Sequence, residues 1–202
     1  MTSLVRALVL VVALVGFVAL AAPASAYDPK QTFLKGSFVL SGEGGGGAQF
    51  NLEGFSDWSQ LDYFFFGARV GYLPFEPAGP GPLWGSFEIG LEPYYQQYTS
   101  PQNAFWAGAF LTFKWHFLGL GRVVPYAELG AGVGGTDLKI REIRTDFAFM
   151  LQGGLGASVF VTDRAAIYAG ARYLHHSNGG TSSPNRGYES IGGVGGVSFF
   201  FE

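Results

Sequence analysis

The sequence predicts an all-β protein: an eight-stranded antiparallel transmembrane β-barrel that follows a cleaved N-terminal signal peptide. Three observations predict this class: an export signal at the N-terminus, segments of about ten residues in which apolar and polar side chains alternate, and an unusual composition. The 202-residue chain has 32 Gly, 20 Phe and 10 Tyr but only 13% charged residues. Such a composition is rare in soluble helical proteins and typical of β-structure that faces lipid.

The N-terminus has the three parts of a signal peptide. Arg6 provides a short positive region, an apolar stretch runs from Ala7 to about Leu20, and Ala24-Ser25-Ala26 forms a small-x-small cleavage pattern. An uncleaved membrane anchor is the alternative, but the apolar stretch is short and ends at the cleavage pattern. We therefore expect a signal peptide over residues 1–26 and an outer-membrane β-barrel over residues 27–202.

Composition also narrows the classes of function. The net charge of −3 gives no basic surface for nucleic acid, and the absence of Cys leaves no disulfide framework. No segment after residue 26 has the roughly 18 consecutive apolar residues of a membrane-spanning helix, so a membrane-spanning chain must here form a closed barrel. No metal-binding spacing occurs, and we expect no metal and no other cofactor.

The alternation of side chains is clearest over residues 146–160. One face carries Phe147, Phe149, Leu151, Leu155 and Val159, and the other carries Asp146, Gln152, Gly154, Gly156 and Ser158. The apolar face of such a strand meets lipid, and the polar or small face lines the lumen. The same pattern predicts eight strands, an even number as in bacterial barrels, over residues 33–42, 60–73, 84–92, 104–117, 125–134, 146–160, 164–177 and 188–201.

The connections between these strands alternate in character. One set is polar or Gly-rich and comprises residues 43–58, 97–103, 135–145 and 178–187; the other comprises 74–83, Leu118-Gly119 and Thr162-Asp163. With both termini in the periplasm, the first set is extracellular and the second periplasmic. Two Gly-rich stretches are not phosphate-binding motifs: Gly44–Gly47 is predicted to be a flexible loop, and 130–135 lacks the following helix that dinucleotide binding requires.

Charged residues of both signs fall on the inward parity of the predicted strands. The lumen of a barrel this narrow is filled by side chains, and an unpaired charge there would be very costly. We therefore predict a paired internal network and no open channel. Its members are Arg69, Glu88, Glu92, Lys114, Glu128 and Arg172.

Three polar residues break the lipid-facing pattern at the extracellular ends of the last two strands. His175 and Ser177 continue the outward parity of residues 164–177, and Glu189 has outward parity at the start of residues 188–201. Serine, histidine and an acid are the parts of a nucleophile, base and orienting group. The alternative is that they are ordinary interfacial residues at a loop edge.

The residues around this set resemble a known family. Arg172–Asn178 and Pro184–Ser190 are similar to the C-terminal signature of the PagL family, the lipid A 3-O-deacylases, and residues 85–93 and 124–132 are also family-like. The resemblance implies an outer-membrane esterase that removes the 3-O-linked acyl chain from lipid A of lipopolysaccharide. It assigns the catalytic histidine to His175, the nucleophile to Ser177 and the acid to Glu189.

The resemblance also implies an oxyanion hole made by Asn178 and the backbone amide of Gly180, with Asn185 as a supporting residue. The sequence departs from the family pattern in two places. Gly179 replaces an alanine, which we expect to loosen the loop, and the chain ends in Glu202 instead of an aromatic residue.

The expected partners are the lipopolysaccharide substrate and the outer membrane, with the active site toward the outer leaflet. Nucleic acid is not expected, and a homodimer is left open. Two other functions compete with the esterase: a non-catalytic structural or adhesive barrel, and a small-solute channel, against which the charged lumen argues.

Overall fold

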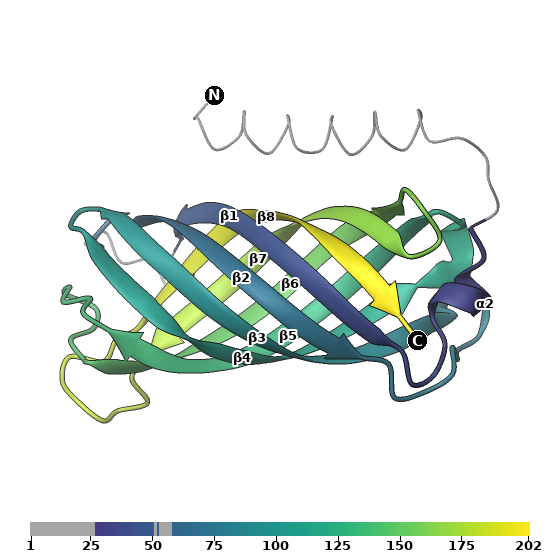
Figure 1. Ribbon diagram of the computed structural model, residues 1–202. Coiled ribbons are helices and arrows are strands. Elements are labelled where there is room, and N and C mark those ends of the chain that lie inside the picture. Colours follow the sequence, from purple (N-terminus) through teal and green to yellow (C-terminus); the bar gives the residue numbers. More distant parts are fainter. Residues whose placement is uncertain (1–26, 51, 53–57) are drawn as a thin grey trace.

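The strands of the chain close into a single barrel (Figure 1) in the computed structural model, which describes residues 27–50, 52 and 58–202. Each strand pairs antiparallel with its neighbours in the chain, and the first strand pairs with the last. The strands are β1 (Phe38–Gln49), β2 (Asp62–Tyr72), β3 (Gly85–Ser100), β4 (Ala104–Phe117), β5 (Val123–Thr136), β6 (Phe147–Phe160), β7 (Ala165–Ser177) and β8 (Tyr188–Phe201). The predicted eight-stranded antiparallel barrel is confirmed.

The helical segments are short and lie outside the sheet. They are α2 (Pro29–Thr32) and the 3₁₀ turns η1 (Gly81–Leu83) and η2 (Leu118–Leu120). No helix within the described residues is long and apolar enough to cross a membrane. The predicted signal peptide, residues 1–26, lies outside the described residues.

The two ends of the barrel differ. Helix α2 and the end of β8 lie at one end, which we call the terminal end (Figure 1). There Phe33, just after α2, is fully buried and packs among apolar side chains of the strands. The opposite end, called the loop end, carries the connections 101–103, 137–146 and 178–187.

Side chains alternate between the two faces of each strand as predicted. In β6, Phe147, Phe149 and Leu151 are exposed on the outer wall, whereas Ala148 and Met150 are buried in the lumen. Val159 has the outward parity but is buried, because it lies directly between the branched side chains of Val123 and Ile167 on the adjacent strands. The outer wall is therefore apolar over most of its height.

The first predicted strand, residues 33–42, is wrong at both ends. β1 begins at Phe38, and the supposed flexible loop Gly44–Gly47 lies inside β1, paired with both β2 and β8. Aromatic side chains of β2 help to explain the two inward-facing glycines. A Cβ atom on Gly45 would lie 2.7 Å from the Phe65 ring, and one on Gly47 would lie 2.4 Å from the Tyr63 hydroxyl. Glycine in β1 thus makes room for rings that fill the lumen.

Two other strands are longer than predicted. β3 continues to Ser100 through the stretch that was expected to begin a loop at residue 97, and β5 covers residues 123–136. The polar residues at the end of β3 resemble a loop in the sequence. In the structure Gln96 and Tyr98 point into the lumen and are fully buried there. The connection 178–187 has the predicted bounds.

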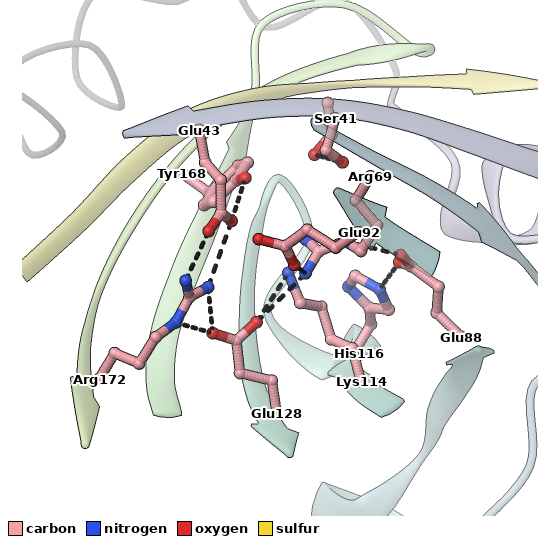
Figure 2. Close-up of polar contacts among 11 residues, drawn as sticks. Ser41, Glu43, Arg69, Glu88, Glu92, Lys114, His116, Glu128, Tyr168 and Arg172 are labelled. Carbon is pink, nitrogen blue, oxygen red and sulfur yellow. Dashed lines mark hydrogen bonds and ion pairs between the residues drawn. The ribbon is translucent and has the colours of Figure 1, made fainter. Parts of the chain in front are cut away.

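A network of ion pairs fills the middle of the lumen (Figure 2). All six predicted inward charges are at most 4% exposed. Glu128 lies at the centre: its Oε1 accepts a hydrogen bond from Arg172 Nη2 at 2.7 Å, and its Oε2 lies 3.3 Å from Lys114 Nζ and 3.5 Å from Arg69 Nη1. Arg69 also pairs with Glu88 and Glu92.

Two members of the network were not among the predicted residues. Glu43 lies in the part of β1 that was predicted to be a loop, and its Oε1 accepts a hydrogen bond from Arg172 Nη1 at 2.5 Å. His116 Nε2 lies 2.8 Å from Glu88 Oε2. With these side chains in place, the middle of the lumen is a buried core of paired charges (Figure 2).

Candidate active site

His175 and Glu189 form a hydrogen-bonded pair on the outer wall at the loop end. They occupy directly opposed positions on β7 and β8, and His175 Nδ1 lies 3.1 Å from Glu189 Oε1. Their side chains are 33% and 19% exposed, so the pair is sheltered but accessible. A carboxylate that accepts the Nδ1 hydrogen leaves Nε2 free to take a proton from another group. This is the arrangement of a general base and its orienting acid.

Ser177 ends β7 on the same face as His175 and lies opposite Phe149 of β6. Side chains two residues apart on a strand start about 6–7 Å apart at the backbone. No hydrogen bond joins Ser177 Oγ to His175 within the described part of the chain. Such contacts often shorten only when the substrate is bound, and the structure places the predicted nucleophile next to the predicted base.

Asn178, which follows Ser177, is fully buried and organises the connection 178–187. Its Nδ2 donates to the backbone oxygen and the Oγ of Ser182 at 2.9 and 2.8 Å, and its Oδ1 accepts from Gly180 N at 2.9 Å. Gly179 and Gly180 have φ angles of 64° and 80°. Glycine adopts this left-handed conformation without strain, so Gly179 suits the turn in which it lies.

The residues expected to form the oxyanion hole are thus engaged inside the loop. Asn178 Nδ2 is bound to Ser182, and Gly180 N is bound to the side chain of Asn178. Asn185 belongs to the same network, because its Oδ1 accepts a hydrogen bond from Asn178 N at 2.8 Å. Asn185 therefore fixes the backbone immediately after Ser177.

A buried polar layer supports the site from the lumen. His176 Nδ1 lies 2.8 Å from the Tyr188 hydroxyl and 3.1 Å from that of Tyr98, and the two hydroxyls are hydrogen-bonded to each other. Because His176 and Tyr188 are the neighbours of His175 and Glu189 in sequence, the layer fixes the register of β7 on β8. Tyr98 belongs to the distant strand β3, so no local pattern in the sequence reveals its contact with His176.

The described residues contain no group of three or more His, Asp or Glu side chains placed to hold a metal ion. Separately, the serine, histidine and glutamate on the wall are side-chain types that acid–base and nucleophilic chemistry uses. Such chemistry transfers an acyl group from an ester to serine and then to water.

A closed antiparallel barrel with an apolar outer wall is the architecture of the outer-membrane β-barrel proteins. Comparison with protein families gives a more specific assignment. The model of the family described as Lipid A 3-O-deacylase (PagL) matches residues 62–198, which is more than half of the 202-residue chain and includes the wall site. The chain belongs to this family of outer-membrane lipid A deacylases.

Solved structures support the fold. The crystal structure of the outer membrane enzyme PagL aligns with a TM-score of 0.56 at 16% sequence identity, over 78% of this chain and 97% of that one. Neisserial surface protein A (NspA) aligns with a TM-score of 0.55, also at 16% identity, over 82% and 99%. No curated protein matches the chain by sequence. Since both structures fit about equally well, the barrel alone does not define the activity.

Proposed function

We propose that the chain is an esterase that removes the 3-O-linked acyl chain from lipid A of lipopolysaccharide by a Ser/His/Glu mechanism. Ser177 is the nucleophile, His175 the general base and Glu189 the acid that orients His175. The observation that carries the proposal is the 3.1 Å contact between His175 Nδ1 and Glu189 Oε1 on the outer wall, beside a serine on the same face.

Acylation begins when His175 Nε2 takes the proton of Ser177 Oγ, which attacks the ester carbonyl carbon. The bond between that carbon and the 3-oxygen of the sugar breaks, and His175 returns the proton to the departing oxygen. Water, deprotonated by His175, then attacks the acyl-serine, and the fatty acid leaves as Ser177 regains its proton. Glu189 stabilises the imidazolium that forms in each half of the reaction.

The oxyanion of each tetrahedral intermediate needs hydrogen-bond donors close to Ser177. Asn178 Nδ2 and Gly180 N are the nearest candidates in sequence, and both are bound inside the loop. In this proposal the substrate oxygen replaces Ser182 and the Asn178 Oδ1 as their acceptor when the loop adjusts. Asn185 keeps the Asn178 backbone in place during the exchange.

The position on the wall suits a lipid substrate. Leu151 and Ile191 lie on the same outer face as the site, one strand to either side of β7, and both are exposed. Acyl chains of a lipid in the outer leaflet would already lie against this apolar surface. The substrate therefore needs no passage through the lumen, and no cofactor enters the reaction.

Mass spectrometry of lipid A tests the proposal. Cells that carry 3-O-acylated lipid A and express the wild-type chain should lose one 3-hydroxyacyl group, and cells that express Ser177→Ala should keep it. Ser183→Ala is the matched control, because Ser183 is an exposed serine of the same connection. Unchanged lipid A with the folded wild-type barrel would contradict the proposal and favour a non-catalytic structural or adhesive barrel.

A further inference from the structure

Glu142 is a fully buried acid in the connection 137–146 at the loop end. Its carboxylate accepts three hydrogen bonds, one from the last residue of β1 and two from the β1–β2 connection: from Gln49 Nε2 at 3.0 Å, Ser59 N at 2.8 Å and Ser59 Oγ at 2.6 Å. A buried carboxylate without hydrogen-bond donors is destabilised by the free energy of removing it from water. Glu142 therefore holds the connection 137–146 in one position relative to β1 and β2.

The backbone around Glu142 holds the connection that carries the candidate site. Glu142 O accepts hydrogen bonds from Arg186 N at 2.8 Å and Gly187 N at 3.3 Å. The next residues continue the contact, since Ile143 forms a β-bridge with Asn185 and Arg144 O accepts from Ser182 Oγ at 2.7 Å. The segment 182–187 thus lies against residues 142–144 along its length.

Gly187 connects the segment 182–187 to His175, the proposed general base. It has a φ angle of 69°, and a Cβ atom at this position would lie 3.4 Å from His175 Cε1 and 2.9 Å from His176 O. The Gly187 backbone therefore packs against the His175 ring, two residues before Glu189. A shift of residues 186–187 would move both members of the hydrogen-bonded pair.

We propose that Glu142 is a positioning residue for the wall site: through its carboxylate it fixes the connection 137–146, and through its backbone oxygen it holds Gly187 against His175. This inference rests on the proposed function. Glu142 touches neither Ser177 nor the ester, so its effect is on the alignment of His175 and Glu189. Misalignment by about 1 Å in an active site can reduce a rate by about 100-fold.

Steady-state kinetics with purified barrel and lipid A in mixed micelles test the inference. Glu142→Ala should lower kcat by about 10- to 100-fold with KM changed less than about twofold, because alignment and not substrate binding is lost. Glu142→Gln keeps an acceptor oxygen and should recover most of kcat. Ser59→Ala removes one donor and should lower kcat less, with no further loss when combined with Glu142→Ala.

The controls separate positioning from folding. Glu76→Ala changes an exposed acid in the β2–β3 connection and should leave kcat unchanged. The folded fraction is read from the difference in gel mobility between unheated and heated samples. A wild-type kcat in folded Glu142→Ala, or a loss of kcat that only follows the folded fraction, overturns the inference.

A second measurement keeps the inference separate from the proposed function. Amide hydrogen exchange at Arg186 and Gly187 should be at least about tenfold faster in Glu142→Ala than in the wild type, whether or not the barrel deacylates lipid A. Equal exchange rates overturn the positioning role. Full activity in Ser177→Ala, by contrast, overturns the proposed mechanism and leaves the exchange result standing.

Discussion

His175 and Glu189 are cross-strand partners: they oppose each other on β7 and β8, with Nδ1 and Oε1 3.1 Å apart. The two strands are joined by the connection 178–187, which also contains the proposed oxyanion donors. One β-hairpin thus contributes every residue of the proposed mechanism. On the lumen side, the contact between His176 and Tyr188 fixes the register of the hairpin. This buried contact therefore also sets the positions of His175 and Glu189 on the outer wall.

Glu189→Gln should lower kcat by about 10²- to 10⁴-fold while the barrel remains folded. An amide cannot stabilise the imidazolium as a carboxylate does, and it can hold the wrong tautomer of His175. Deacylation kinetics of purified protein check this, with Asp163→Asn, an exposed acid at the terminal end, as the matched control. A Glu189→Gln protein with wild-type kcat would remove the acid from the mechanism.

Asn178 and Ser182 are hydrogen-bonded to each other. Substituting each in turn therefore distinguishes a catalytic role of Asn178 from a structural role in the loop. Asn178→Ala removes a proposed oxyanion donor and should cost about 10²- to 10³-fold in kcat. Ser182→Ala removes an acceptor of the same amide but leaves the donor intact, and we expect a loss of only a few-fold. Equal losses in the two variants would mean that Asn178 serves the loop and not the oxyanion.

Glu128→Ala should destabilise the barrel by about 3–5 kcal/mol, because it leaves Arg172 and Lys114 buried beside a missing partner. Glu202→Ala removes the partner of Arg164 in a pair whose side chains are more than 60% exposed, and should cost at most about 1 kcal/mol. Urea unfolding of barrels folded in lipid vesicles measures both values. Equal costs would show that the lumen network is not a source of stability.

The Glu142 contact should weaken in acid. Burial opposes ionisation of Glu142, but hydrogen bonds from Ser59 and Gln49 outweigh it and lower the pKa of the carboxyl from 4.5. The stabilisation is therefore complete above about pH 4.5 and is lost as the pH falls through the lowered pKa.

Hydrogen-exchange protection factors of Ser59 N and Arg186 N, corrected for intrinsic rates, check this pH dependence. Both should be constant from pH 7 to about 5 and fall below pH 4.5 in the wild type. In Glu142→Gln, which does not titrate, they should be flat. A fall of the same size in Glu142→Gln would assign the effect to another group.

Alternation of side chains was enough to predict the barrel and the outward set of polar residues. The period of two is a local property of a strand, so the parity of His175, Ser177 and Glu189 followed from the residues around each. The direct opposition of His175 and Glu189 on β7 and β8 is known only from the structure, because a connection as long as 178–187 does not fix the register of a hairpin. Parity also placed Arg69, Glu128 and Arg172 in the lumen before any contact was known.

Errors arose where the partner of a residue lies on another strand. Gly44–Gly47 has no alternation of its own, and glycine is needed at Gly45 and Gly47 because of side chains on β2 and backbone oxygens on β8. Glu43 was missed for the same reason, since it belongs to that misassigned stretch. Glu142 depends on Ser59, 83 residues away in sequence, and no local pattern reveals such a contact.

The pair of Glu43 and Arg172 has a consequence for how the protein assembles. Glu43 lies on the first strand and Arg172 on the seventh, 129 residues apart, and β1 and β8 meet only when the sheet closes. Until the sheet closes, Arg172 lacks Glu43, one of its two carboxylate partners. An open sheet in the bilayer would therefore hold an incompletely paired guanidinium. Insertion that completes the ring in one concerted step avoids this cost, so the charges of the lumen favour a barrel that is either fully shut or not yet in the membrane.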